Sequence, residues 1–278
     1  MNETYKIALC QMLVTPEKEQ NMKRAGECIA EAAENGSKVI CLPEIWNCPY
    51  DVKLFGNYAE PEDGPSVVFM SSVAKKYGVY LVGGSIPELA ETDDDKKGAS
   101  HVYNTSFVFS PSGEMIAKHR KVHLFDIDIE NGIRFKESDF FSAGDSLTLF
   151  DTEMGKMGLA ICFDVRFPEM FREMTRAGAE IIFLPASFNM TTGPVHWELL
   201  IKSRALDNQL YLAACASARN ENASYLSWGH SCVATPWGEL AASADEKESI
   251  AYAEIDRRFL KKVRREIPIG NQWDQESS

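Results

Sequence analysis

Cys162 lies where an apolar run gives way to charged residues, in the stretch KMGLAICFDVRFPEM at 156–170. The small apolar residues before it are typical of a buried strand, and Pro168 suits the first turn of a helix. Ligands bind at the carboxyl ends of strands in open α/β sheets. Backbone N–H groups there can lower a thiol pKa and hold an oxyanion. We therefore expect Cys162 to be a nucleophile, although free cysteine is also a common core residue.

Glu44 and Lys121 are the candidate partners of this thiol. VICLPE ends a second buried strand with Glu44, and burial raises a carboxyl pKa towards the range that is useful for proton transfer. Lys121 closes a third strand in AKHRKVH, where a cation beside the thiol would favour the thiolate and stabilise an oxyanion. The alternatives are a strand-end glutamate in water and a solvated lysine.

Other chemistries lack a recognisable pattern. None of the five histidines, which are His101, His119, His123, His196 and His230, lies in a sequence typical of a Cys–His hydrolase. The pair in HRKVH has no third metal ligand at a known spacing, so we expect an exposed strand face and a loop start there. G-x-S-x-G, P-loop and G-x-G-x-x-G motifs are missing from the sequence. We predict no metal site.

Strands and helices alternate at both ends of the chain, which predicts an α/β layered domain. Helices are expected at 17–35, 65–77, 168–177 and 194–208, and a last helix should place Leu260, Val263 and Ile267 on one side. Between the two ends, HVYNTSFVFS and MIAKHRKV flank a turn at 111–114 and predict a β-hairpin. ETDDDKKGAS is read as a polar surface loop. The weakly patterned segment 123–144 is long enough to be functional or disordered.

Composition limits the classes of partner. The 278 residues are 45% hydrophobic with no linker or repeat, so we expect a single domain over 1–278. The net charge of −12 argues against nucleic acid and anionic membrane surfaces as partners. No apolar run reaches the length of a membrane span. Seven cysteines without C-x-x-C spacing indicate reduced thiols and a cytoplasmic protein.

Three blocks in order, LPE with Glu44, HRKVHLF with Lys121 and AICFDVRFPE with Cys162, resemble the nitrilase superfamily of carbon–nitrogen hydrolases. The resemblance runs from ALCQM to about 267 and implies a four-layer α-β-β-α sandwich, with 268–278 as a C-terminal tail. It implies a cysteine nucleophile, a glutamate base, a lysine that stabilises the intermediate, and no cofactor. The family's second glutamate falls on Glu137 in RFKES. The backbone N–H of Phe163, where many relatives have Tyr, is the expected oxyanion donor.

Within the superfamily, blocks such as LPEIWNCPYDVKLF and FNMTTGPVHWELL are most similar to the omega-amidase branch. That resemblance implies hydrolysis of the terminal amide of 2-oxoglutaramate or 2-oxosuccinamate. Arg166 is the candidate for the substrate carboxylate, the alternative being an ion pair with Asp164 or Glu169. Tyr50 and Thr192 are weaker substrate-binding candidates.

Two other functions stay open. A related branch member would cleave deaminated glutathione or an N-carbamoyl amine, and a non-catalytic binding or scaffold protein could retain the same fold. The resemblance also implies a homodimer or a higher homo-oligomer. The tail IGNQWDQESS lacks the Arg-Arg and Asp-Leu-Tyr elements that often close family members, which leaves its contacts open.

Overall fold

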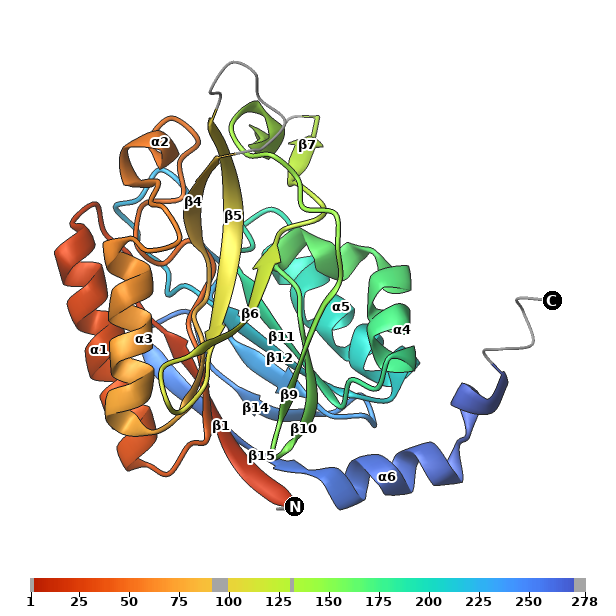
Figure 1. The fold of residues 1–278 in the computed structure, drawn as a ribbon. Coiled ribbons are helices and arrows are strands. Elements are labelled where there is room, and N and C mark those ends of the chain that lie inside the picture. The colour runs from red at the N-terminus through yellow and green to blue at the C-terminus, as the bar shows by residue number, and fades with distance from the viewer. Residues whose placement is uncertain (1–2, 92–99, 131–132, 273–278) are drawn as a thin grey trace.

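Two β-sheets packed face to face, with helices on both outer faces, form the body of the protein (Figure 1). The computed structural model describes residues 3–91, 100–130 and 133–272. The layers follow the order helix, sheet, sheet, helix, which confirms the predicted four-layer α-β-β-α sandwich. None of the helices in these ranges is both long and apolar enough to cross a membrane.

The first sheet has seven strands, and the first and last strands of the described chain both belong to it. Its order is β15 (Ser249–Asp256), β1 (Thr4–Gln11), β2 (Val39–Cys41), β3 (Tyr80–Val82), β5 (Ser100–Phe109) and β4 (Ile86–Glu91), and β6 (Met115–Arg120) also pairs with β5. The strands β1, β2 and β3 are parallel, whereas β15 runs antiparallel to β1. The predicted hairpin is confirmed as the antiparallel pair β5–β6.

The second sheet has six strands and carries the cysteine. Its order is β14 (Leu240–Ser243), β13 (Cys232–Ala234), β12 (Tyr211–Ala216), β11 (Ile181–Ala186), β10 (Gly155–Leu159) and β9 (Thr148–Thr152). The three central strands β10, β11 and β12 are parallel. Every residue of β11 and β12 is buried, because both faces of this sheet are covered.

Alternation along β1 shows how the strands fill the layers. Ile7 and Leu9 point into the core between the two sheets, where they join Met157 and Phe183. Ala8 and Cys10 point to the opposite face and pack under the helices. Successive side chains of a strand face opposite sides, so an almost continuously apolar strand fits only between two apolar layers.

The helices cover the outer faces. The helices α1 (Lys18–Glu34) and α3 (Pro65–Tyr77) cover the first sheet, and α4 (Pro168–Arg176) and α5 (Gly193–Asn208) cover the second. The remaining helices are α2 (Phe55–Tyr58) and α6 (Arg257–Glu266). The four covering helices begin and end within one residue of the predicted bounds. In α6, Leu260 and Val263 are buried as expected. Ile267 lies one residue beyond the end of the helix and is 44% exposed, so it adds little to the buried face.

The weakly patterned segment 123–144 contains short elements. The strands β7 (Asp126–Asp128) and β8 (Arg134–Lys136) pair antiparallel, and a 3₁₀ turn η1 (Glu137–Asp139) follows. The described part of this segment is therefore ordered, as a small hairpin that leads into a buried glutamate, and the functional alternative stays open. The predicted polar loop falls mainly on 92–99, outside the described residues.

Candidate active site

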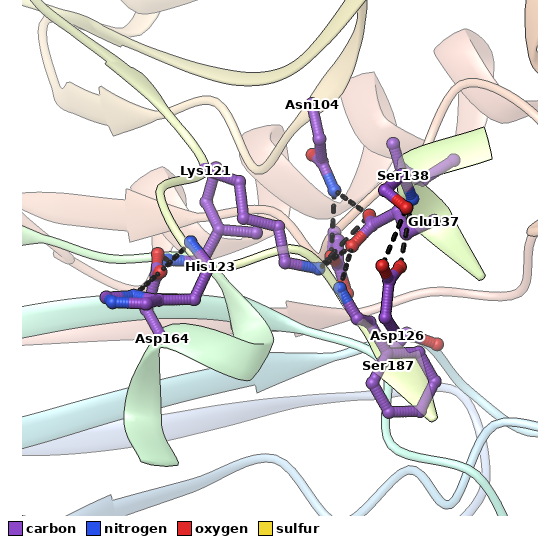
Figure 2. A network of polar contacts seen from close by, with 12 residues as sticks. Asn104, Lys121, His123, Asp126, Glu137, Ser138, Asp164 and Ser187 are labelled. Atoms are coloured by element: carbon purple, nitrogen blue, oxygen red, sulfur yellow. Dashed lines mark hydrogen bonds and ion pairs between the residues drawn. The ribbon is translucent and has the colours of Figure 1, made fainter. Parts of the chain in front are cut away.

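Two carboxylates converge on one buried lysine. Glu44 follows β2, Lys121 follows β6 and Glu137 begins η1, and all three side chains are buried. Lys121 Nζ lies 2.9 Å from Glu44 Oε1 and 2.8 Å from Glu137 Oε2. Figure 2 shows the lysine side chain reaching between the segments towards Glu137. Neither solvated alternative from the sequence applies, because the three groups pair with one another.

Asn104 in β5 also joins the two carboxylates. Its Nδ2 donates to Glu44 Oε1 at 2.9 Å and to Glu137 Oε1 at 3.1 Å (Figure 2). The backbone N–H of Phe125 donates to Glu137 Oε2 at 2.6 Å. Among the described residues, Glu44 Oε2 has no hydrogen-bond partner although it is buried. One oxygen of Glu44 is therefore fixed, and the other is available to a substrate or to the thiol.

Cys162 begins a 3₁₀ turn, η2 (Cys162–Arg166), three residues after β10 ends. Its φ of +45° lies in the left-handed region, which costs a residue other than glycine about 1–2 kcal/mol. The side chain is 4% exposed. This sharp turn presents the thiol at the carboxyl end of the strand, as expected from the sequence.

Burial and neighbouring charges set the protonation of the site. Burial raises the pKa of the Cys162 thiol, the Glu44 carboxylate raises it further, and Lys121 opposes both. Burial also raises the pKa of Glu44, and Lys121 only partly offsets this. The charges of Glu137 and Glu44 outweigh burial at Lys121, so its pKa lies above the ordinary lysine value. The resting site thus combines a neutral Cys162 thiol, a Glu44 carboxyl group with a raised pKa, and a Lys121 that stays positively charged.

A cavity of about 510 Å³ opens onto Glu44. Glu44, Tyr50, Ser187 and Tyr225 line it, together with Leu13–Glu17 and residues of the 217–227 loop. Tyr50 Oη lies 3.4 Å from Glu44 Oε1, and its ring centroid is 4.6 Å from that of Tyr225. The volume is in the range of small-molecule sites. Tyr50 therefore lies where a substrate would contact it.

A much tighter crevice, which is too small to admit a water molecule, lies on the cysteine side of this cavity. Cys162, Phe163, Arg166 and Thr192 line it, and Ser187 borders both spaces. The guanidinium of Arg166 lies 5.5 Å from the ring centroid of Phe163. Among the described residues, Arg166 forms no ion pair with Asp164 or Glu169, so the structural alternative proposed from the sequence is wrong. Its Nε is buried without a hydrogen-bond partner in that part of the chain.

Of the two histidines in HRKVH, His123 lies in the loop after β6 as expected, whereas His119 lies in a different environment from the one expected. His119 is 1% exposed, so the expected exposed strand face is wrong there. Both imidazoles contact Asp164, at 3.3 Å from His119 Nε2 and 2.8 Å from His123 Nδ1. The described residues contain no group of three or more His, Cys, Asp or Glu side chains arranged to hold a metal ion.

Sequence reasoning missed Asn104 and Tyr225 as members of the site. Asn104 is buried inside β5, but other polar residues in the same strand, such as Thr105 and Ser106, leave no local signal that distinguishes it. Tyr225 Oη donates to the carbonyl of Ser187 at 2.6 Å. This tyrosine comes from an irregular loop whose sequence does not indicate which cavity it lines.

Comparison with known proteins gives one consistent result. The carbon–nitrogen hydrolase family model matches residues 6–265. The chain is 47% identical to omega-amidase NIT2-A of Xenopus laevis, over 96% of this chain and 94% of that one. It is 45% identical to human omega-amidase NIT2, over 97% and 95%. The crystal structure of Saccharomyces cerevisiae Nit3, a member of branch 10 of the nitrilase superfamily, is similar with a TM-score of 0.86 and 41% identity, covering 95% and 94%.

Proposed function

Because the chain belongs to the carbon–nitrogen hydrolase family and is a hydrolase of amide bonds, we propose that it acts as an omega-amidase. Its substrates are small omega-amido-2-oxo acids, 2-oxoglutaramate and 2-oxosuccinamate, which it converts to a dicarboxylate and ammonia. The relatives that carry the omega-amidase name match over nearly the full chain. The observation that carries the proposal is the buried Glu44, which has one oxygen fixed by Lys121 and the other without a hydrogen-bond partner among the described residues.

The reaction begins with proton transfer from Cys162 to Glu44. The thiolate sulfur attacks the amide carbon, and the oxyanion is stabilised by Lys121 Nζ and the Phe163 N–H. The raised pKa of Glu44 suits a group that first accepts this proton and then returns it. Protonated Glu44 donates to the leaving nitrogen, the carbon–nitrogen bond breaks, and ammonia departs to leave a thioester.

Water then hydrolyses the thioester. Glu44 accepts a proton from the water, hydroxide adds to the carbonyl carbon, and the carbon–sulfur bond breaks to release the carboxylate. The thiol regains its proton from Glu44. Glu137 holds Lys121 in place through its hydrogen bonds, which keeps the cation beside the oxyanion.

The substrate carboxylate is assigned to Arg166. Arg166 Nε has no hydrogen-bond partner among the described residues and lies beside Cys162, which supports this role, and the side chains around the crevice must move apart to admit the carboxylate. A guanidinium can hold a carboxylate through two parallel hydrogen bonds. Thr192 borders the same crevice and Tyr50 the larger cavity, and both complete the binding site. Replacement of Arg166 by Lys should raise the KM for 2-oxoglutaramate and leave kcat less affected.

The cavity volume of about 510 Å³ favours one second candidate, a bulkier amide such as deaminated glutathione. A substrate panel separates the two, with ammonia release measured for both 2-oxo acid amides and for N-carbamoyl amines, and peptide cleavage for deaminated glutathione. The proposal requires the highest kcat/KM on an omega-amido-2-oxo acid. It also requires a thioester mass on Cys162 during turnover, and loss of turnover without unfolding in Cys162→Ala.

We further propose that the protein is cytoplasmic and forms a homodimer or a higher homo-oligomer. Exposed apolar side chains on α5, including Val195 and Leu199, are 62% and 65% exposed and could be covered in such an assembly. Light scattering of the purified protein tests the assembly state.

A further inference from the structure

Asp164 connects the two segments that carry Cys162 and Lys121. It follows Cys162 by two residues, and His123 follows Lys121 by two residues. Asp164 Oδ2 accepts the backbone N–H of Ile161 at 2.9 Å, and Oδ1 accepts the backbone N–H of His123 at 2.9 Å. One buried carboxylate therefore joins the backbone before the cysteine to the backbone after the lysine.

Two imidazoles strengthen the same connection. His123 Nδ1 lies 2.8 Å from Oδ1 and His119 Nε2 lies 3.3 Å from Oδ2 (Figure 2 shows His123). An ionised carboxylate only accepts hydrogen bonds, so both ring nitrogens donate. Burial alone would raise the pKa of Asp164, but the bonds from His119 and His123 outweigh it and hold that pKa below the ordinary value. His119 and His123, which precede and follow Lys121 by two residues in the sequence, thus both bind Asp164.

The turn at Cys162 needs such support because its backbone is strained. A φ of +45° persists only where surrounding contacts determine it. The Asp164 bond to the N–H of Ile161 closes this turn from inside. His123 also stacks on Phe167, with ring centroids 3.5 Å apart. Two contacts thus hold the lysine segment against the cysteine turn, one through Asp164 and one through Phe167.

We propose that Asp164 is a positioning residue that fixes the Cys162 turn and the Lys121 segment relative to each other. It is not among the residues that line either cavity, so it acts through Cys162 and Lys121 and not on the substrate. This inference rests on the proposed function, in which the sulfur and the ammonium must face the same carbonyl group. A misplacement of about 1 Å can cost about 100-fold in rate.

The first test replaces Asp164 by Asn. The amide cannot accept at its nitrogen, so one side of the connection is lost with little change in size. We expect kcat to fall by about 100-fold and KM to change by less than about threefold. We also expect slower alkylation of Cys162 by chloroacetamide, measured by peptide mass spectrometry. This measurement can be made without knowing the natural substrate.

Glu60→Gln is the matched control. Glu60 is a buried carboxylate that also joins two segments, because it accepts the backbone N–H of Ser66 at 2.7 Å and Asn47 Nδ2 at 3.3 Å. Its loss should lower the melting temperature but leave kcat and Cys162 alkylation within about twofold of the wild type. A general loss of stability would affect both variants alike.

A second pair of variants keeps Asp164 itself. In His123→Ala the ring donor and its stacking on Phe167 are lost, whereas in His123→Asn the amide nitrogen can replace Nδ1 as a donor. We expect about a tenfold fall in kcat for the alanine variant, and recovery of most of it in the asparagine variant. This pair gives a result even if Asp164→Asn fails to fold.

Four outcomes would overturn the inference. A folded Asp164→Asn with wild-type kcat and alkylation rate would overturn the positioning role alone, as would equal losses in Glu60→Gln. Wild-type activity in His123→Ala would do the same. A wild-type protein with an unreactive Cys162 and no ammonia release would overturn the proposed function, and the positioning role with it.

Discussion

Lys121 and Glu44 form a buried ion pair across 77 residues of sequence, with 2.9 Å between Nζ and Oε1. The pair fixes one oxygen of the carboxylate and leaves Oε2 without a partner among the described residues. The same cation also pairs with Glu137. One lysine therefore compensates two buried carboxylates and orients one of them, and both effects can be measured.

Replacement of Lys121 by Met should lower stability and abolish activity. Removal of one partner of a buried ion pair leaves an uncompensated charge, which costs about 3–5 kcal/mol in the free energy of unfolding. Urea denaturation followed by circular dichroism measures this loss, and ammonia release measures activity. The side chain is completely buried, so a surface effect cannot account for the result.

The triple variant with Lys121→Met, Glu44→Gln and Glu137→Gln is the control for that prediction. It removes the two orphaned charges, so most of the lost stability should return while activity stays absent. If Lys121→Met were as stable as the wild type, the pair would not be acting as a buried charge network.

The Glu44→Gln variant should lose more kcat than the Glu137→Gln variant. Glu44 presents the free oxygen that the mechanism uses for proton transfer, so its loss should cost about 10³-fold or more in kcat. Glu137 accepts from Lys121, Asn104 and the Phe125 N–H, and a glutamine retains one acceptor oxygen. We expect about 10- to 100-fold for that variant. Equal losses, measured as initial rates at saturating substrate, would contradict the separate roles.

Glu44 and Cys162 were predictable because each follows an apolar run. Glu44 follows the fully buried strand β2, and Cys162 follows β10. Parallel strands bring their carboxyl ends to one edge, so these positions could be read from local pattern. The helices α3 and α5 were predictable for similar reasons, since each has a proline at its first turns and a residue in the left-handed conformation at its end.

The remaining features depend on contacts between distant segments. His119 is buried because β6 packs against β9 and the Cys162 turn, and local sequence carries no record of that packing. The hairpin β7–β8 has three-residue strands with exposed charged ends, too short for a periodic signal. Ile267 continues the apolar spacing of α6, but the helix ends one residue earlier.

Activity should fall on the acid side at a pH above the ordinary glutamate pKa of 4.5. Burial raises the pKa of Glu44, and the negative charge of Glu137 raises it further. The base form is the carboxylate, so activity is present above this raised pKa and is lost as the pH falls through it. Lys121, whose pKa is raised, keeps its charge through the neutral range. The pH profile of kcat/KM gives the midpoint.

The Glu137→Gln variant tests whether the acid midpoint of this pH profile moves in the expected direction. It removes a negative charge that raises the pKa of Glu44, so the acid midpoint should move to lower pH in the residual activity. Lys53→Gln, at an exposed position, is the control and should not move it. A shift to higher pH in Glu137→Gln would mean that the titrating group is not Glu44.

The loop Gly83–Ser85 shapes the approach to Glu44, and Gly84→Ala should disrupt it. Gly84 has φ +62°, and an added Cβ would lie 2.1 Å from the carbonyl oxygen of Pro43. That contact forces the Pro43–Glu44 peptide to move, in addition to the left-handed strain of about 1–2 kcal/mol. We expect a loss of about 3–4 kcal/mol in the free energy of unfolding and a fall in kcat larger than the change in KM.

Gly78→Ala separates strain from the clash. Gly78 ends α3 with φ +63°, nearly the same as Gly84, but nothing lies within 4 Å of its added Cβ. It should lose only the strain of about 1–2 kcal/mol and keep wild-type kcat. Urea denaturation and initial rates compare the two variants at a temperature where both are folded. Equal stabilities would show that the Pro43 carbonyl yields without cost, and equal kcat values would show that Glu44 does not depend on this loop for its position.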